Sequence, residues 1–294
     1  MRPGSTARRR IERISVKGDD AVRRSRDDLL AVEEPLEIRV VRAGDGGRAA
    51  DEAAVRVAVT MRTPGADFEL AAGFLFSEGL IDRGEAVARI RYCTDAPQQY
   101  NVVSVYLAPG ADVDPALLSR NFYTTSSCGV CGKASIEAVA GPACAPVAAG
   151  PEIDAALLLS LPPKLREAQR VFERTGGLHG AAQFTAQGDL VRVREDVGRH
   201  NALDKLVGAA LLGGELPLAG CIVLVSGRLS FELVQKAARA GVPVLAGVSA
   251  PSSLAVELAE QAGMTLAGFV RDGGFNVYAG GARIAHRSRQ GVGG

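Results

Sequence analysis

The sequence predicts an α/β protein made of a small N-terminal α+β domain followed by a larger α/β domain. Three observations lead to this prediction. The chain has 294 residues and is 47% hydrophobic, which is enough for one large or two modest cores. Its first half combines strand patterns with one helix pattern. In its second half strand and helix patterns alternate with short links, as in a mostly parallel or mixed sheet that is covered by helices.

The first block, over residues 35–120, contains four strand patterns and one helix pattern. Apolar and polar residues alternate over 36–42 and 55–61, which is typical of half-buried strands. Two more strands are expected at 88–93 and 102–107. Asp67 is expected to cap a helix with one apolar face, and Gly79 marks the end of that helix. These elements predict a small sheet with one helix packed across it.

The second block, over residues 121–285, begins with two helix patterns and then alternates. The helices are expected at 134–139, 165–174, 199–212, 231–240 and 254–262, and the strands at 181–185, 190–195, 221–226, 242–247 and 264–270. Ligands bind outside the carboxyl ends of the strands in open α/β sheets. We therefore expect a functional site at the strand-to-helix turns of this block.

Two charged or Gly-rich ends flank these blocks, an arm over 1–34 and a flexible tail over 286–294. Residues 1–26 hold nine basic and three acidic side chains, a net charge of +6, while the whole chain carries +1. The first interpretation of the arm is a disordered, solvated segment, and the alternative is an electrostatic docking arm.

The composition also narrows the function classes. The near-neutral charge and the absence of tryptophan argue against nucleic-acid binding. No secretory signal or membrane-spanning apolar run is evident, so we expect a cytoplasmic protein.

The segment Ser126–Lys133 contains Cys128 and Cys131 at C-x-x-C spacing, with glycines at 129 and 132. A following helix start and Lys133 would favour the thiolate, which is the nucleophilic form of cysteine. Four interpretations remain open: a zinc site, a redox disulfide pair, two buried structural cysteines, and a thiol that carries a persulfide or acts as another nucleophile.

Three further segments lie at strand ends, and each has a structural and a functional interpretation. Between residues 195 and 205, Asp196 caps a helix, or Arg199 and His200 hold a phosphate or assist proton transfer. Ser226 and the serines at 249, 252 and 253 are ordinary helix caps or phosphate ligands. Residues 268–276 form a hairpin turn, or a binding site for a base and a phosphate.

Taken together, these segments resemble the FdhD family, the formate dehydrogenase accessory sulfurtransferases. The resemblance covers roughly residues 35–280 and is most specific in the run Asn121–Ser135, which holds both cysteines, and in Asp196–Asn201. It implies a cytidine-deaminase-like fold for the larger domain. Deaminase chemistry itself is not expected, because Ser127 replaces the proline before the C-x-x-C and no H-x-E is present.

The resemblance also implies a function, a site and partners. A persulfide on Cys128, assisted by Cys131, would take sulfur from a cysteine desulfurase. It would pass the sulfur to the molybdenum cofactor Mo-bis(molybdopterin guanine dinucleotide) before insertion into formate dehydrogenase. The resemblance places cofactor binding on Phe269, Val270, Arg271, Asp272, Gly273 and Gly274. It further implies a homodimer. The alternatives are a non-catalytic molybdenum-cofactor chaperone and a zinc or redox C-x-x-C protein, and no tightly bound metal is expected.

Overall fold

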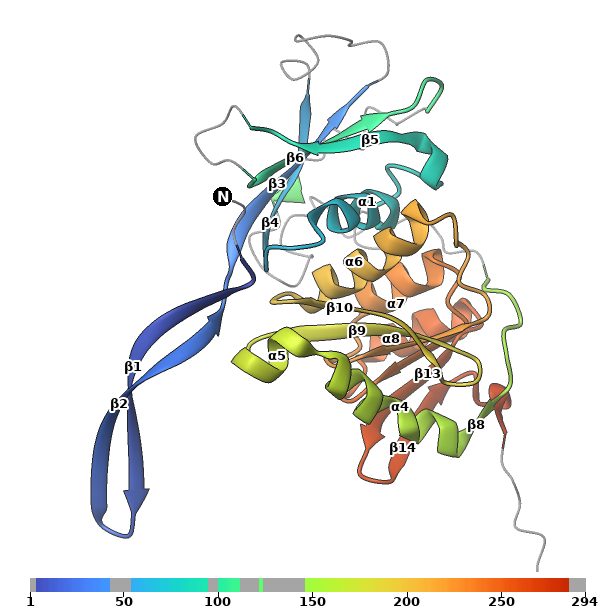
Figure 1. Ribbon diagram of the computed structural model, residues 1–294. Coiled ribbons are helices and arrows are strands. Elements are labelled where there is room, and N and C mark those ends of the chain that lie inside the picture. The colour runs from blue at the N-terminus through green and yellow to red at the C-terminus, as the bar shows by residue number, and fades with distance from the viewer. Residues whose placement is uncertain (1–3, 43–53, 95–99, 112–121, 124–145, 286–294) are drawn as a thin grey trace, which may run out of the picture.

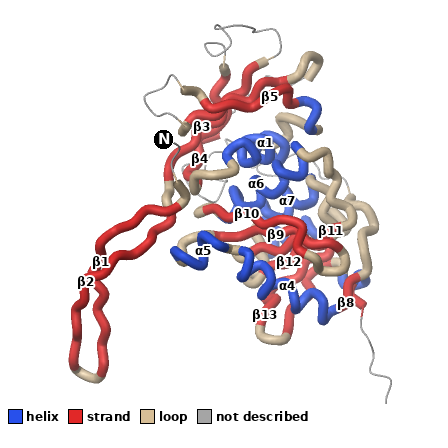
Figure 2. Tube along the Cα trace, viewed as in Figure 1, coloured by secondary structure: helices blue, strands red, loops and turns tan. Residues whose placement is uncertain are grey.

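A computed structural model describes residues 4–42, 54–94, 100–111, 122–123 and 146–285. Figure 1 and Figure 2 show three parts: a long projecting hairpin, a small sheet with one helix, and a larger sheet between two helical layers. The predicted fold class is confirmed, with a mixed rather than a mostly parallel sheet in the larger part.

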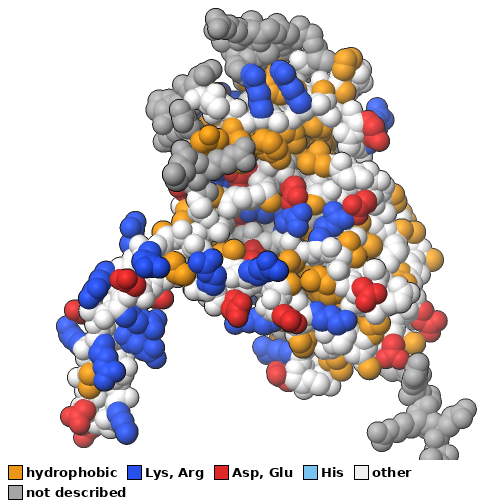
Figure 3. Space-filling model, viewed as in Figure 1, with side chains coloured by type: hydrophobic (Ala, Val, Ile, Leu, Met, Phe, Trp, Pro, Cys, Tyr) orange, Lys and Arg blue, Asp and Glu red, His pale blue; other side chains and the backbone are white. Residues whose placement is uncertain are grey.

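The N-terminal arm is a β-hairpin, so the expectation of a disordered segment is wrong. Strand β1 (Thr6–Lys17) pairs antiparallel with β2 (Asp20–Ala31) in unbroken register. Gly18 adopts a positive φ of 61° at the tight turn, a conformation that glycine takes without steric cost. Cross-strand ion pairs such as Arg23–Glu12 offset part of the positive charge. Most of the hairpin's side chains are exposed, and Figure 3 shows basic residues along its length.

The small sheet has the strand order β5-β6-β3-β4-β7. Its strands are β3 (Glu34–Val41), β4 (Val55–Arg62), β5 (Val87–Tyr92), β6 (Val102–Leu107) and β7 (Phe122–Tyr123), with a 3₁₀ turn η2 at Gly84–Ala86. Helix α1 (Asp67–Ser77) packs across them. The four predicted strands and the helix are present. Residues 122–123 also belong to this sheet, although the sequence placed residue 121 at the start of the second block.

Asp67 does not cap helix α1, contrary to the sequence prediction. The N-cap residue is Ala66, with a φ of 54°. The Asp67 carboxylate instead accepts hydrogen bonds from Arg62 Nη2 at 2.9 Å and Arg62 Nε at 3.2 Å. Both side chains are buried, and a buried guanidinium needs such a bidentate partner. The arginine therefore determines where the carboxylate points.

The larger sheet has the order β10-β9-β11-β12-β13-β14. Its strands are β9 (His179–Thr185), β10 (Leu190–Asp196), β11 (Cys221–Val225), β12 (Val244–Gly247), β13 (Thr265–Arg271) and β14 (Gly274–Ala279). Strands β11, β12 and β13 are parallel, whereas the pairs β9–β10, β9–β11 and β13–β14 are antiparallel.

Helices cover both faces of the larger sheet. The helices α6 (Arg199–Leu212), α7 (Phe231–Arg239) and α8 (Ser253–Gln261) lie on one face, and α4 (Ala155–Ala168) and α5 (Arg170–Thr175) lie on the other. Alternate strand residues divide accordingly, with Val223 in the α6–α8 core and Ile222 and Leu224 in the α4 core. The 3₁₀ turn η4 (Gly281–Arg283) leads into the short strand β15 (Ile284–Ala285), which pairs in parallel with β8 (Ile153–Asp154).

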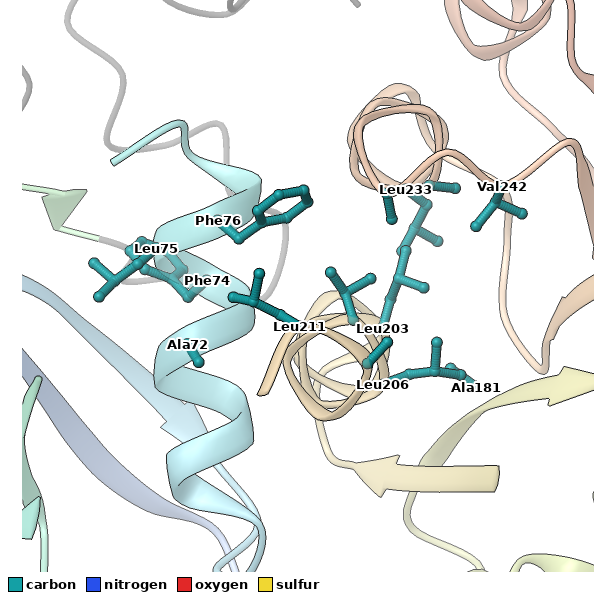
Figure 4. Close-up of a cluster of buried hydrophobic side chains, with 14 of the residues drawn as sticks. Ala72, Phe74, Leu75, Phe76, Ala181, Leu203, Leu206, Leu211, Leu233 and Val242 are labelled. Carbon is teal, nitrogen blue, oxygen red and sulfur yellow. The ribbon is translucent and has the colours of Figure 1, made fainter. Parts of the chain in front are cut away.

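Helices α1 and α6 join the small and the larger part through one continuous core. Apolar side chains of both helices belong to this core. In Figure 4, Leu211 of α6 points toward α1, near Phe74 and Phe76, and Leu206 lies beside Ala181 of the larger sheet. The helix backbones touch where Gly73 faces residue 204 and Gly208 faces residue 69. A β-carbon added to Gly208 would lie 1.8 Å from the carbonyl oxygen of Glu69. No side chain fits at this crossing.

We expect Gly208→Ala to lower the free energy of unfolding by about 1–3 kcal/mol or more, because the two helices must separate to admit the methyl group. Urea unfolding of the purified protein measures this change. Gly220→Ala is the control, since a β-carbon there meets no atom within 4 Å. This substitution is expected to leave stability unchanged or to raise it, by about 0.4–1 kcal/mol. Equal stability of the two variants would contradict the close crossing.

Candidate functional site

One edge of the larger sheet gathers the strand ends that the sequence singled out. Strands β10, β11, β12 and β13 all end there, and β9 begins there because it runs antiparallel to β10 and β11. Hydrogen bonds link neighbouring turns: Ser226 Oγ accepts from Gly180 N at 2.8 Å, and Ser249 O accepts from Phe269 N at 3.2 Å. This is the edge at which ligands bind in open α/β sheets.

A cavity of about 830 Å³ opens beside this edge, within the size range of small-molecule and cofactor sites. One wall comes from α4, α5 and the segment leading into β9, and the other comes from the strand ends. The lining residues are Leu159, Pro162, Pro163, Leu165, Arg166, Gln169, Phe172, Gly176, Gly177, Leu178 and His179 on the first wall, and Ser226, Val248, Arg271, Asp272 and Gly273 on the second.

The predicted cofactor segment 269–274 forms the β13–β14 turn, and three of its residues line the cavity: Arg271, Asp272 and Gly273. Val270 is fully buried in the α4 core, and Phe269 and Gly274 are not among the lining residues. Phe269 and Asp272 have φ values of 54° and 53°, which are rare for residues with a side chain and store backbone strain. This strained turn presents Arg271 at the cavity.

The described lining residues carry two guanidinium groups, those of Arg166 and Arg271. The Arg271 side chain is 58% exposed and lies 3.5 Å from the Asp272 carboxylate, an exposed ion pair that contributes little energy. Burial lowers the pKa of His179, the neighbouring Arg199 and His200 lower it further, and Asp196 opposes this shift only in part. Its imidazole is therefore neutral at neutral pH, and the cavity suits a ligand with both an anionic and an uncharged part.

The residues around the start of α6 form a buried network beside the cavity and are not among those that line it. The carboxylate of Asp196 accepts hydrogen bonds from Gly198 N at 2.8 Å and Asn201 Nδ2 at 3.0 Å, and lies 2.6 Å from Lys205 Nζ. The N-cap residue of α6 is Gly198, so Asp196 supports the helix start without capping it. His200 is buried, with Nε2 3.0 Å from both Ser230 Oγ and Glu232 Oε2.

Three polar residues that line the cavity were not predicted from the sequence to contact a ligand: Arg166, Gln169 and His179. They became part of a site only because helix α4 ends at Ala168 and a separate helix α5 begins at Arg170, where the sequence predicted one helix over 165–174. The two prolines at 162 and 163 were the available signal, but proline alone does not indicate a ligand.

The predicted sulfur-carrying cysteines Cys128 and Cys131 lie outside the described residues, as do Lys133, Cys144, the helix expected at 134–139 and the tail over 286–294. Cys93 and Cys221 are free, half-buried thiols, and Gln183 Nε2 donates to Cys221 Sγ at 3.0 Å. Over the described part of the chain, no group of three or more His, Cys, Asp or Glu side chains is arranged to hold a metal. The helices described there are also too short or too polar to cross a membrane.

This architecture is that of an α/β protein with a mixed sheet and a ligand-sized cavity at its strand ends. The chain matches the FdhD/NarQ family over residues 31–285. The protein belongs to the FdhD/NarQ family.

Relatives and a solved structure agree with this assignment. A sulfur carrier protein FdhD of Streptomyces avermitilis is 55% identical over 96% of this chain and 97% of its own, and one of Mycobacterium tuberculosis is 49% identical over 95% and 99%. The fold is similar to a crystal structure of a formate dehydrogenase accessory protein from Desulfotalea psychrophila. The TM-score is 0.68 at 27% identity, over 95% of this chain and 99% of the other.

Proposed function

We propose that this protein is a sulfur carrier required for formate dehydrogenase activity. In this role it takes persulfide sulfur from a cysteine desulfurase and delivers it to Mo-bis(molybdopterin guanine dinucleotide), its substrate. Family membership and the names of close relatives support the carrier role. The observation that carries the proposal is the cavity, because Arg271, Asp272 and Gly273 of the expected cofactor segment line it.

The proposed loading step is a thiol–disulfide-type exchange at Cys128. The Cys128 thiolate attacks the outer sulfur of the donor persulfide, the sulfur–sulfur bond of the donor breaks, and the donor cysteine leaves as a thiolate. One sulfur atom passes from the donor cysteine to Cys128, and the step involves no net oxidation or reduction. It requires a thiolate at Cys128 and access for the donor persulfide.

The proposed release step uses Cys131. Its thiolate attacks the Cys128 sulfur, the persulfide bond breaks, and sulfide passes to the acceptor while a Cys128–Cys131 disulfide forms. The two electrons that convert the outer sulfur to sulfide come from the cysteine pair. A cellular dithiol reductant then restores both thiols.

The cavity is proposed to hold the guanine nucleotide part of the cofactor. Arg271 is the exposed cation on the strand-end wall, where a phosphate would find the guanidinium and the backbone of the Gly273 turn. Guanidinium groups bind phosphate oxygens through paired, charge-assisted hydrogen bonds. From the resemblance we also propose a homodimer and a cytoplasmic location.

Arg271→Ala is expected to weaken binding of guanosine diphosphate about tenfold or more, because a hydrogen bond to a charged group contributes about 1.5–3 kcal/mol. Calorimetric titration of the full chain at fixed salt measures the change. Arg83→Ala is the matched control: Arg83 is an exposed arginine of the small part, paired with Asp82, and does not line the cavity. Unchanged affinity in Arg271→Ala would place the phosphate site elsewhere.

Two rival functions predict different results. A non-catalytic chaperone of the molybdenum cofactor needs the cavity but neither cysteine, so it would retain activity without Cys128. A zinc or redox C-x-x-C protein would retain near-stoichiometric zinc through purification or would cycle a disulfide without forming a persulfide. Elemental analysis and persulfide trapping separate these functions from sulfur transfer.

A further inference from the structure

The wall of the cavity that α4 and α5 form carries a buried polar group without a partner. Gln169 is 3% exposed and lines the cavity. Among the described residues, its side-chain nitrogen Nε2 has no hydrogen-bond partner. A buried donor left unpaired costs free energy, commonly 1–3 kcal/mol, and native structures retain few such groups. Its position at a ligand-sized cavity supplies a reason for keeping it.

The position of Gln169 is held by its own backbone and by a glycine. Its backbone N–H donates to Leu165 O at 3.1 Å, and its carbonyl accepts from Glu173 N at 2.9 Å. These bonds fix the junction between α4 and α5. The side-chain amide packs against Gly180, where an added β-carbon would lie 2.7 Å from Nε2. The absence of a side chain at 180 therefore makes room for the amide.

Helix α5 is in turn anchored to the sheet. The carboxylate of Glu195, near the end of β10, accepts hydrogen bonds from Val171 N at 3.0 Å and Phe172 N at 2.7 Å. This carboxylate satisfies two of the free N–H groups at the helix start. The wall that carries Gln169 is thus attached to the same sheet that carries Arg271.

The surroundings of Gln169 are largely apolar. Pro162, Leu165, Phe172 and Leu178 line this wall, and the Arg166 guanidinium lies 4.1 Å from the centre of the Phe172 ring. Apolar and aromatic surfaces with one placed polar group are typical of sites that bind the uncharged ring of a ligand. The strand-end wall is more polar, with Ser226, Arg271 and Asp272.

We propose that the α4–α5 wall is the subsite for the purine base, and that Gln169 donates its Nε2–H to an acceptor of that base. The strand-end wall holds the phosphates. The inference rests on the proposed function, because it takes a guanine nucleotide as the ligand. It goes further by dividing the cavity into a base half and a phosphate half and by assigning a recognition residue to the base half.

Gln169→Leu tests the proposal with two probes, guanosine diphosphate and inorganic pyrophosphate, titrated into the full chain. Leucine keeps the volume and removes the donor. We expect affinity for guanosine diphosphate to fall about tenfold, as for a lost hydrogen bond that leaves a buried acceptor unpaired, and affinity for pyrophosphate to stay unchanged. Arg271→Ala, in contrast, is expected to weaken binding of both probes.

Urea unfolding of the unliganded variants separates recognition from a structural role. Because Gln169 leaves a buried donor unpaired, Gln169→Leu should unfold at the same or a higher urea concentration. Unchanged affinity for guanosine diphosphate would overturn the proposal, and so would an equal loss for both probes or a marked loss of stability. If the unsubstituted protein binds pyrophosphate but no guanosine diphosphate, the guanine ligand of the proposed function is itself wrong and the base subsite fails with it.

Discussion

Cys128→Ala is expected to abolish sulfur transfer while leaving the fold unchanged. The thiolate is the nucleophile of the proposed loading step, and a methyl group can neither attack a persulfide nor carry one. No other group in the proposed relay replaces it at that step. The expected loss is complete within the sensitivity of the assay, which makes this the largest functional effect that we predict.

Two measurements check this expectation. After incubation with a cysteine desulfurase and cysteine, alkylation and mass spectrometry should show one additional sulfur atom on Cys128 in the unsubstituted protein. In a strain that lacks the gene, the variant should fail to restore formate dehydrogenase activity. Cys221→Ala is the control, because Cys221 is a half-buried thiol at the start of β11 and has no role in the relay.

The variant Cys131→Ala separates the loading step from the release step. Under the proposed mechanism it still accepts sulfur from the donor, since loading uses Cys128 alone, but it releases sulfide far more slowly because no neighbouring thiolate breaks the persulfide bond. Persulfide should therefore accumulate on Cys128. Restoration of formate dehydrogenase activity by Cys128→Ala would refute the relay and favour the chaperone function.

Lys236→Met is expected to lower the free energy of unfolding at neutral pH by about 3–5 kcal/mol, the usual cost of leaving one partner of a buried ion pair alone. Lys236 Nζ lies 2.9 Å from both carboxylate oxygens of Asp204, and both side chains are buried. Ser77 donates to the same carboxylate at 2.8 Å. The substitution would leave a buried carboxylate with only this hydroxyl.

The loss should depend on pH in a definite direction. Burial raises the pKa of Asp204, and attraction to Lys236 and the hydrogen bonds from Lys236 and Ser77 offset that rise only in part. Without the lysine, the folded-state pKa of Asp204 rises further above its unfolded value. Stability is then retained where Asp204 is protonated and lost as pH rises through the folded-state pKa. The deficit relative to the unsubstituted protein should therefore shrink as pH falls from about 8 to about 5.

The double variant Asp204→Asn with Lys236→Met is the control for this prediction. It removes both charges and is expected to recover much of the lost stability, because an uncharged pair carries no large desolvation cost. Urea unfolding at several pH values measures all three proteins. A single variant as stable as the unsubstituted protein at neutral pH would contradict a buried, charged pair.

Periodicity predicted five of the six strands of the larger sheet, because their apolar residues repeat with the period of the structure that buries them. Strand β14 was not predicted. Helix α6 begins and ends at the predicted residues, Arg199 and Leu212. The arm was mispredicted because its composition indicates solvation, whereas backbone pairing across the Gly18 turn makes a hairpin. Its exposed side chains carry no periodic burial signal that a sequence can reveal.

The roles of side chains whose partners lie far away in the chain could not be predicted from the sequence either. Asp67 precedes an apolar helix, as a cap would, but Arg62 engages its carboxylate. His200 follows a strand end, as a phosphate ligand would, but it lies buried against Glu232 and Ser230. In each case a second residue from another element decides the role.

By itself, the sequence determined the fold class, the C-x-x-C pair and the family resemblance that the comparisons confirmed. It also determined the strand-end turn that holds Arg271, because these features are encoded by residues close together in the chain. The tertiary structure alone decided that Gln169, His179 and Arg271 line one cavity. These three residues are separated by up to about a hundred positions, and only the antiparallel course of β9 beside the parallel strands brings them to the same edge.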